Sequence, residues 1–291
     1  MLASLHIYPL KGGRAVDLDH AAVEPWGLAG DRRWLLVDAD CQFMSQRKHP
    51  ALARVVVTVG PGAGITVSSD GYPTLPVAAP DVSAELLKVT VWRSTVLAAS
   101  AGDAADAWFS GYLGEPARLV YLDDPTRRAV DPEYGQDGDT VSFADGYPLL
   151  LTSTASLDQL NQWLTAAGDQ PVPMNRFRPN GVVSGFEPWA EDRWQRIRIG
   201  PVWFRVAKPC GRCVVTTTDQ ATGMRGSQPL KMLAARRRFG KNLVFGQNLI
   251  PDSSGHIRMG DPIELILFRR NISRSRLNMR PIVPSTFSRD N

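Results

Sequence analysis

The sequence predicts a mainly β protein of the α+β class, built from two β-rich lobes and a few helices. Between residues 1 and 122, short runs of β-branched and aromatic residues alternate with turn clusters, as in SLHIYPL, RRWLLVDAD and KVTVWRSTVLAAS. This alternation is typical of antiparallel strands. The second half repeats the pattern in GVVSGF, RWQRIRIGPVWFRVA and DPIELILF. With 291 residues, 43% of them hydrophobic, the chain can bury a full-sized core in one large domain or two moderate ones.

Local patterns place the elements that end the first lobe. Gly60 and Gly64 enclose a turn cluster between two valine-rich runs, which predicts a hairpin connection. Alanines together with Trp108, Phe109 and Leu113 recur at helical spacing, so we expect an amphipathic helix over residues 102 to 113. The stretch from 123 to 148 is polar and contains proline and glycine. We expect it to add little to the core and to form a linker or a loop over a site.

Two helices are predicted in the second half. The segment LLLTSTASLDQLNQWL has a Ser/Thr-rich start suited to N-capping, followed by one apolar helical face made by Leu157, Leu160, Trp163 and Leu164. A shorter helix is expected from Pro229 to Arg238, since proline is tolerated in a first helical turn. The predicted organisation is therefore a domain of residues 1–122, a domain of residues 123–268 and a basic, flexible tail of residues 269–291.

The positive charge of the chain is concentrated in that tail. The formal net charge is +4, but residues 269–291 carry +5, so the remaining body is close to neutral at −1. A proline- and serine-containing segment without apolar periodicity is expected to lie unpacked on the surface. We therefore do not expect a nucleic-acid partner, and non-specific RNA binding by the tail is the alternative.

The cysteine count and the N-terminus indicate the compartment. Cys41, Cys210 and Cys213 are too few, and odd in number, for a disulfide scaffold, and the four histidines show no metal-ligand spacing with them. No apolar run reaches the roughly 18 residues that a membrane span needs. The N-terminus also lacks a basic start followed by an apolar run and a cleavage site. These features predict a cytosolic protein without a membrane span.

The first candidate site is the pair in Cys210-Gly-Arg-Cys213. It joins an apolar strand to a run of threonines and a turn, and it is flanked by Lys208 and Arg212. Nearby cations and unpaired backbone N–H groups lower the pKa of a thiol, and the resulting thiolate binds metals or attacks electrophiles. By itself the CxxC spacing also fits thioredoxin-like exchange, half a zinc site or coincidence. The strand and turn flanks argue against the thioredoxin-like reading, which needs a helix after the first cysteine.

Cationic residues form the other candidate groups. Arg176 and Arg178 precede Pro179 in a segment expected to be extended, where their donors fit phosphate or pterin oxygens, or form a solvated strand edge. Lys11 precedes a glycine pair whose backbone can approach an anion. Arg32 stands beside Asp31, which fits either an anion contact or an ordinary turn ion pair. A third N-terminal group is Ser45-Gln46-Arg47.

Together these groups resemble one family in the correct order along the chain. The segments IYPLKG, GLAGDRRWLLVD, RFRPNGVVSG, KPCGRCVVTTTDQATG and FGQNLI are similar to those of MOSC-domain proteins that carry a MOSC N-terminal β-barrel domain. The similarity runs from about residue 2 to residue 268, and RCxxTTxDxxTG is its most specific motif. Relatives include the mitochondrial amidoxime-reducing component and bacterial reductases of N-hydroxylated bases. The resemblance implies a β-barrel-like N-terminal domain, a closed C-terminal β-barrel and a cofactor between them.

The resemblance also implies the site residues. Cys213 would ligate the molybdenum of the molybdenum cofactor, with Cys210 as a neighbour. The positions that surround the cofactor's phosphate and pterin in the family are Lys11, Arg32, Arg47, Arg178, Asn180, Arg212 and Asn248, with Tyr147 lining the other side. The chain departs from the family pattern at Gly12, where serine is frequent, and at Gln220, where proline is frequent.

The activity implied by the resemblance is molybdenum-dependent reduction of amidoximes, hydroxylamines or N-hydroxy nucleobases, in a detoxification role. Electrons would come from separate flavin and iron–sulfur or haem proteins, because no cysteine follows Cys213 to hold an appended [2Fe–2S] cluster. The alternative is a sulfur carrier or transferase, in which Cys213 bears a persulfide. Lys11 and Arg32 favour the reductase, since a carrier does not need them. A non-catalytic cofactor-binding protein is the third possibility.

Overall fold

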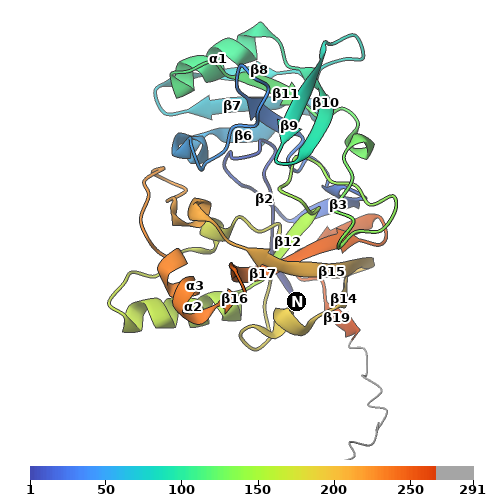
Figure 1. Cartoon of the computed structure of the whole chain (residues 1–291). Helices are drawn as coiled ribbons and strands as arrows, with labels where there is room; N and C mark the ends of the chain where they lie inside the picture. The colour runs from blue at the N-terminus through green and yellow to red at the C-terminus, as the bar shows by residue number, and fades with distance from the viewer. Residues whose placement is uncertain (267–291) are drawn as a thin grey trace, which may run out of the picture.

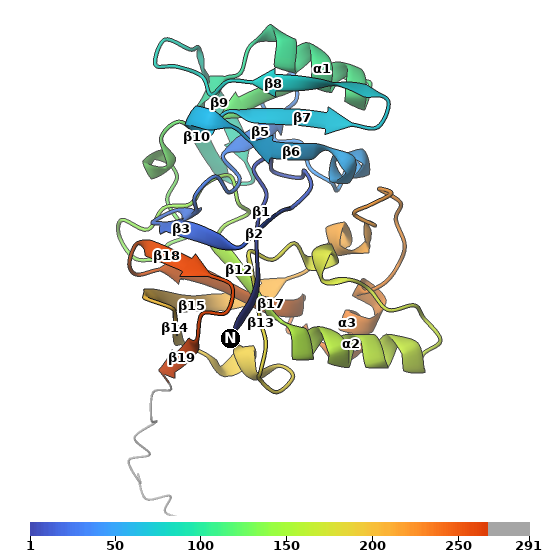
Figure 2. The ribbon, with the colours of Figure 1, turned by 180° about the vertical axis from the view of Figure 1, so that it is seen from behind.

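A computed structural model describes residues 1–266, and the predicted basic tail of residues 269–291 lies outside the described part. The described chain is mainly β, as predicted, and forms two lobes (Figure 1). Its three α-helices are α1 (Asp103–Leu113), α2 (Thr154–Ala166) and α3 (Leu230–Arg236). The helix α1 lies at the outer end of one lobe, whereas α2 and α3 lie side by side on the other (Figures 1 and 2).

The larger lobe is organised around a mixed sheet of nine strands. Eight follow one path in the order β19, β14, β15, β17, β12, β13, β1, β2, and β16 pairs with β17. Their bounds are β1 Leu2–Ile7, β2 Val16–Leu18, β12 Leu149–Ser153, β13 Gly181–Val183, β14 Arg196–Ile199, β15 Val202–Gly211, β16 Arg238–Phe239, β17 Asn242–Pro251 and β19 Ile263–Ile266. Only β12 and β13 pair in parallel.

The closed C-terminal barrel that the resemblance implied is not confirmed. The path of strands ends at β19 on one side and at β2 on the other, and no pairing joins these two ends within residues 1–266. The sheet is strongly bent, with bulges where β15 pairs with β17 and where β1 pairs with β13. Because bulges increase local bend and twist, the sheet curves into a half-barrel without closing.

The smaller lobe contains two antiparallel sheets. The four-stranded sheet has the order β5 (Trp34–Val37), β11 (Arg118–Tyr121), β10 (Ser94–Ser100), β9 (Leu86–Val91). The three-stranded sheet has the order β6 (Val56–Val59), β7 (Ile65–Ser69), β8 (Tyr72–Val77). The hairpin predicted at Gly60–Gly64 is confirmed, since it joins β6 to β7. The helix α1 packs on this lobe through Trp108 and Phe109, which share a core with Trp34 and Val67.

The start of the chain belongs structurally to the larger lobe. Strand β1 pairs with β13, and a further three-stranded sheet joins β3 (His20–Glu24) to β4 (Gly27–Leu28) and to β18 (Gly255–Arg258) near the other end of the described chain. Figure 2 shows β1 and β2 running from the N-terminus up toward the smaller lobe. Leu5 and Ile7 are buried in one core cluster with Phe204 and Leu249. The first strands of the chain are therefore held in the larger lobe by strand pairing and by its core.

The helix predictions agree with the structure except at the helix ends. Helix α1 begins one residue after the predicted start, and the apolar face predicted for α2 is buried at Leu160 and Leu164. The predicted N-cap is wrong, because the hydroxyl of Ser153 makes no capping hydrogen bond. The third helix is shorter than predicted, because Arg238 begins β16.

The stretch from 123 to 148 has one of its two predicted roles and one that was missed. It is a loop over a site, as shown below, but the expectation that it adds little core is wrong. Val130, Val141 and Phe143 are buried, and the Arg128 guanidinium donates to the carbonyls of Ser142 and Ala144. The loop is therefore folded around an internal cation.

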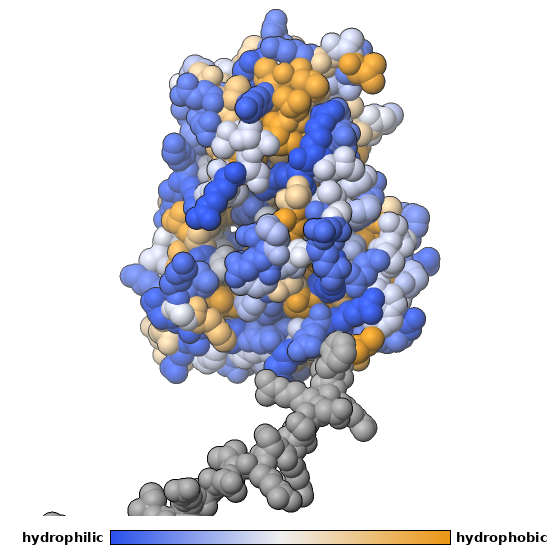
Figure 3. All heavy atoms as spheres, turned by 45° about the vertical axis from the view of Figure 1, so that its right-hand side comes forward, coloured by the Kyte–Doolittle hydropathy of each residue, from blue (hydrophilic) through white to orange (hydrophobic). Residues whose placement is uncertain are grey.

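The outer surface is largely polar. In the face shown in Figure 3, hydrophilic residues predominate and hydrophobic ones occur in small groups, the largest near the top, on the smaller lobe. Within residues 1–266, no helix combines the length and apolar character that a membrane crossing requires.

Candidate functional site

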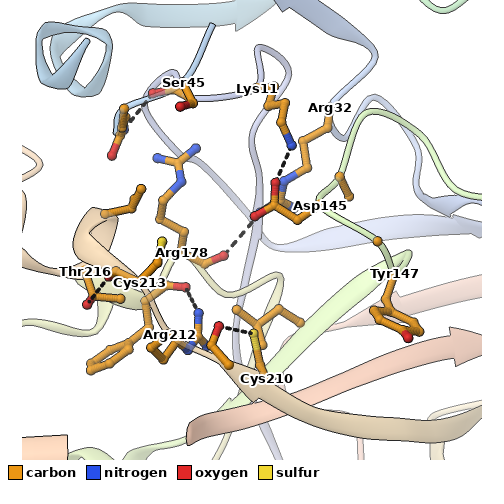
Figure 4. Close-up of a pocket in the computed structure, with 18 of the residues that line it drawn as sticks. Lys11, Arg32, Ser45, Asp145, Tyr147, Arg178, Cys210, Arg212, Cys213 and Thr216 are labelled. Atoms are coloured by element: carbon orange, nitrogen blue, oxygen red, sulfur yellow. Dashed lines mark hydrogen bonds and ion pairs between the residues drawn. The ribbon is translucent and has the colours of Figure 1, made fainter. Parts of the chain in front are cut away.

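A pocket lies where the two lobes meet, and it gathers most of the residues predicted from the sequence (Figure 4). All nine predicted site residues line it: Lys11, Arg32, Arg47, Tyr147, Arg178, Asn180, Arg212, Cys213 and Asn248. They come from segments nearly the length of the chain apart. In Figure 4, Lys11 and Arg32 enter from one side and the cysteine-bearing strand from the other.

The two cysteines stand at the end of β15, where the sequence placed a strand followed by a turn. Cys213 precedes the 3₁₀ turn η6 (Val214–Thr217), and its carbonyl accepts hydrogen bonds from the backbone N–H of Thr216 at 3.1 Å and from its hydroxyl at 3.0 Å. Both thiols are partly exposed and free. Burial raises the pKa of the Cys210 thiol. A raised pKa disfavours the thiolate, so the lowered thiol pKa expected from the flanking cations is wrong for Cys210.

Lys11 is held in the pocket by Asp145. Its Nζ lies 2.5 Å from a carboxylate oxygen of Asp145 and donates to the carbonyl of Phe143 at 2.7 Å. Burial lowers the pKa of Lys11 to about 8, although Asp145 acts in the opposite direction. Burial alone would raise the pKa of Asp145, but the attraction of Lys11 outweighs it and holds that pKa well below its usual range. At neutral pH the pair is therefore ionised, and most of the Asp145 side chain is open to the pocket.

Arg32 forms the predicted turn ion pair with Asp31, and it also lines the pocket. It adopts a left-handed backbone conformation with φ 47°, and its guanidinium lies 2.5 Å from the buried Asp31 carboxylate. The same guanidinium donates to the side-chain oxygen of Asn180 at 2.9 Å. Asn180 also accepts from the backbone of Leu150 and donates to that of His6. Asn180 is thus a buried brace that fixes Arg32.

Arg178 lines the pocket and directly follows a 3₁₀ turn of the larger lobe. The expectation of an extended segment is wrong, because residues Met174–Phe177 form a 3₁₀ turn and Arg178 follows in a left-handed conformation with φ 54°. Its guanidinium lies 4.2 Å from the centre of the Tyr8 ring, and Arg32 lies 4.4 Å from the same ring. Burial lowers the pKa of Arg178 to about 10 and raises that of Tyr8 to about 12. Arg178 nevertheless stays charged at neutral pH.

Arg212 and Asn248 brace the strands beneath Cys213. The Arg212 guanidinium donates to the carbonyl of Phe245 from Nε at 2.8 Å and to that of Phe177 at 3.1 Å. The Asn248 amide donates to the carbonyl of Lys208 at 3.3 Å. These bonds tie β15 to its neighbour β17, so they fix the position of the strand end that carries the cysteines.

The remaining predicted residues lie at the edges of the pocket. Arg47 is exposed, and its guanidinium lies 4.3 Å from the centre of the Trp92 ring. Tyr147 lies on the far side of the pocket from Cys213 in Figure 4, as expected from the resemblance. Burial raises the pKa of Tyr147, and its hydroxyl has no hydrogen-bond partner among the described residues.

Two pocket residues were missed by the sequence reasoning. Asp145 lies in the stretch 123–148, which carried only a general signal for a loop over a site. Trp92 sits in the two-residue turn between β9 and β10 with a positive φ of 57°, which is unusual for a bulky residue. Its indole N–H donates to Asp145 at 3.2 Å. No local pattern marks either residue, because each acts through partners far away in the sequence.

The two departures from the family pattern are resolved differently. Gln220 exchanges amide hydrogen bonds with Gln46 of the smaller lobe at 3.1 and 3.2 Å, and it accepts another from Arg178 at 3.1 Å. The glutamine therefore joins the loop after Cys213 to the other lobe. Gly12 has a φ of +90°, a conformation that suits glycine, and its carbonyl accepts from Gln46.

The pocket is strongly cationic. Its lining includes six cationic side chains, those of Lys11, Arg32, Arg47, Arg176, Arg178 and Arg212, against the single carboxylate of Asp145. Lys11, Arg32 and Arg176 each pair with a carboxylate. The other three, Arg47, Arg178 and Arg212, form no ion pair among residues 1–266. The pocket therefore offers a thiol beside an excess of positive charge, which suits an anionic ligand.

Comparison with known proteins agrees with this geometry. The MOSC N-terminal beta barrel domain matches residues 1–116, and the MOSC domain matches residues 138–264. Mitochondrial amidoxime-reducing component 1 of Homo sapiens is 32% identical over 286 residues, which cover 91% of this chain and 82% of the relative. The chain belongs to the MOSC family. The counterpart in Xenopus laevis is 30% identical, covering 90% of this chain and 81% of the relative.

A second kind of MOSC protein is also similar. The molybdenum cofactor sulfurase of Oryza sativa subsp. japonica is 30% identical over 261 residues, covering 84% of this chain but only 32% of the relative. The names of these two groups of relatives support a MOSC-type protein associated with the molybdenum cofactor.

The comparisons correct one prediction. The relatives from Homo sapiens, Xenopus laevis and Mus musculus are all named as mitochondrial proteins, so the predicted cytosolic location is wrong. That prediction relied on the lack of a secretory-signal pattern at the N-terminus. Such a pattern reports on secretion, and its absence does not distinguish the cytosol from an organelle.

Proposed function

We propose that this MOSC protein is a molybdenum-cofactor-dependent reductase of N-hydroxylated compounds, with Cys213 as the protein ligand of the metal. The observation that carries the proposal is the pocket between the lobes, where a free thiol stands beside an excess of guanidinium groups. The similarity to proteins named amidoxime-reducing components supports the same reading.

The residues present fit the cofactor. A pterin cofactor of this kind carries a phosphate, and Arg47 and Arg178 are cations whose charge no carboxylate balances among the described residues. Burial lowers the pKa of Arg178 to about 10, because it destabilises the charged guanidinium. An anion bound against Arg178 would stabilise that charge. A thiolate is the ligand type that suits a soft metal site.

Each residue then has a distinct task. Cys213 holds the metal, Lys11, Arg47 and Arg178 bind the phosphate and pterin oxygens, and Asn180 and Arg212 keep the surrounding backbone in place. When bound, the molybdenum centre supplies the two-electron redox chemistry, and the protein supplies binding, orientation and local charge. Asp145 holds the Lys11 ammonium in a fixed position through their 2.5 Å ion pair.

The proposed substrates are amidoximes, hydroxylamines or N-hydroxy nucleobases. Cleavage of the N–O bond consumes two electrons and two protons, and it yields the N–H compound and water. The electrons come from separate flavin and iron–sulfur or haem proteins in this proposal. If the isolated, cofactor-loaded chain reduced such a substrate from NADH at full rate, the need for separate donors would be disproved.

Metal content tests the proposed ligand directly. Protein from a host that makes the cofactor is compared with Cys213→Ala and Cys210→Ala by elemental mass spectrometry. We expect near-stoichiometric molybdenum in the wild type and in Cys210→Ala, and loss of most of it in Cys213→Ala. Equal metal content in all three proteins would disprove ligation by Cys213.

A sulfur carrier or transferase is the second candidate, because the similarity includes a molybdenum cofactor sulfurase. In that case Cys213 bears a persulfide, and Lys11 and Arg178 have no required task. Wild-type protein without molybdenum from a competent host, together with a Cys213 persulfide detected by intact mass, would favour this candidate over the reductase.

A further inference from the structure

The segment that follows the Cys213 motif carries only positively charged side chains among its charged residues. Between Asp219 and Asp252 the chain has no acidic residue and six cationic ones, Arg225, Lys231, Arg236, Arg237, Arg238 and Lys241. Two of them have structural roles. Arg237 is buried against Asp192 at 2.6 Å, and Arg225 donates to the carbonyls of Gln46 and Arg47. The other four are Lys231, Arg236, Arg238 and Lys241.

These four residues lie within one short segment of the chain, residues 231–241. Lys231 and Arg236 are on α3, Arg238 is on β16, and Lys241 is in the turn that leads into β17. All four residues are exposed, and none takes part in an ion pair within residues 1–266. Phe239 lies among them with 49% of its surface exposed. We call Lys231, Arg236, Arg238, Lys241 and Phe239 the basic face.

The basic face is directly connected to the cysteine-bearing strand. Arg238 pairs with Leu243, whose carbonyl accepts a 2.7 Å hydrogen bond from the backbone N–H of Arg212, next to Cys213. From the other side, α3 contacts η6, the turn that follows Cys213. Leu233 of α3 is buried in one cluster with Phe177 and Phe245, whose carbonyls hold the Arg212 guanidinium. A protein bound at this face would therefore contact α3 and β16, the elements that pack against the segment carrying Cys213.

We propose that the basic face is the docking site of an acidic one-electron carrier protein that delivers electrons to the Cys213 pocket. The inference builds on the proposed reductase activity, which requires a separate donor. Clustered charges of one sign steer a partner of opposite charge and accelerate encounter, and they add little affinity at high salt. An exposed aromatic residue within a charged rim is typical of protein interfaces.

The size of the face favours a protein over a nucleic acid. The basic face has four exposed cations and one exposed aromatic residue within residues 231–241, whereas a DNA-binding protein can make about 6–10 phosphate contacts. Rapid, reversible docking through a few charges is what a carrier needs, because it must leave after giving up each electron.

Charge reversal tests the docking site. The full chain is compared with the triple variant Lys231→Glu/Arg238→Glu/Lys241→Glu in titrations with a plant-type [2Fe–2S] ferredoxin as the acidic probe, at low ionic strength. We expect the triple variant to bind about tenfold or more weakly, because like charges now face each other. The wild-type affinity should also fall steeply with added salt.

A matched control carries the same change in net charge elsewhere. The variant Arg14→Glu/Lys88→Glu/Arg258→Glu alters three exposed residues on other segments, and we expect it to bind the ferredoxin within about threefold of the wild type. Equal weakening by both triple variants would show an effect of net charge alone and would overturn the proposal. Tighter binding of a single-stranded oligonucleotide than of ferredoxin through the same three residues would also overturn it.

Binding and turnover separate this inference from the proposed function. If the basic-face variant loses ferredoxin binding while no N-hydroxylated substrate is ever reduced, the docking site stands and the proposed activity fails. If a reduced viologen drives substrate reduction but the basic-face variant binds ferredoxin as tightly as the wild type, the activity stands and the docking site is wrong.

Discussion

At the scale of single residues, the pocket lining contains more cationic side chains than carboxylates. Lys11 is the most sensitive of them, because burial lowers its pKa to about 8 while the adjacent Asp145 partly compensates. The arginines around it keep their charge at any physiological pH. Lys11 is therefore the cation whose charge changes first as the pH rises.

We predict that the cofactor is retained less well above about pH 8. An anion bound to Lys11 stabilises the ammonium, so by linkage the affinity falls as the pH rises through the Lys11 pKa. The measurement is the amount of pterin that stays with the protein after gel filtration between pH 7 and pH 9.5. Lys11→Arg should flatten this dependence, because the guanidinium remains charged throughout the range.

The pairing with Asp145 gives the control for that experiment. Asp145 raises the Lys11 pKa, so Asp145→Asn should move the loss of pterin to lower pH. A wild-type protein that retains the pterin equally at pH 7 and pH 9.5 would show that Lys11 does not bind the anion.

The sequence identified the chemical residues of the pocket better than their supports. Cys213 and Lys11 stand in local motifs whose residue types already indicate their chemistry. Asp145 and Trp92 could not be found in this way, because their importance comes from contacts with distant segments. Arg178 was identified correctly as a pocket cation but placed on the wrong backbone, since the turn before it depends on tertiary packing.

At the scale of elements, the loop after Cys213 is held to the smaller lobe by an amide pair. Gln46 and Gln220 are both buried, and each donates to the other's side-chain oxygen. Removing either amide breaks both hydrogen bonds of the pair, although Gln46 keeps its bond to Gly12 and Gln220 keeps its bond from Arg178. A buried polar group that loses one of its hydrogen-bond partners in this way costs about 1–3 kcal/mol.

We predict that Gln220→Ala and Gln46→Ala each lower the free energy of unfolding by about 1–3 kcal/mol. The double variant should lose less than the sum of the two, because the second substitution removes the group that the first left unpaired. Urea unfolding curves measure all three. The exposed Gln162 of α2 provides the control, and Gln162→Ala should stay within about 0.5 kcal/mol of the wild type. Strict additivity would show that the two amides do not interact.

Elements with a strong local signal were predicted well. Helices α1 and α2 and the hairpin at Gly60–Gly64 each follow from spacing or turn residues within a short window. The N-cap of α2 was wrong because a serine at that position can point its hydroxyl elsewhere, and neighbouring packing decides which way.

At the scale of the whole molecule, the larger lobe depends on the first strands of the chain. β1 pairs with β13, and β3 pairs with β18, so the core of the larger lobe includes residues from both ends of the described chain. A boundary at residue 122, predicted from the sequence, assigns these strands to the first domain and remains a prediction. The strand pairing gives a way to test it.

We predict that residues 125–266 alone do not fold stably, because Leu5 and Ile7 of β1 are missing from their core. A fusion of residues 1–28 to residues 125–266 through a flexible glycine–serine linker should regain a cooperative thermal transition, followed by circular dichroism. A cooperative transition in the unfused fragment would show that β1 is dispensable and that the domain boundary at 122 is also a folding boundary.

The sequence by itself determined the fold class, the helices with clear periodicity, the family and, through the family resemblance, nine of the residues that line the pocket. These features depend on residue type and on short spacing, which the chain displays directly. Tertiary structure alone decided that the larger sheet stays open within residues 1–266, that β1 joins the second half, and that Asp145 and Trp92 line the pocket. It also decided that the Gln46–Gln220 pair joins the loop after Cys213 to the smaller lobe. Each of these depends on contacts between segments far apart in the chain, and no local pattern records which distant partner a residue meets.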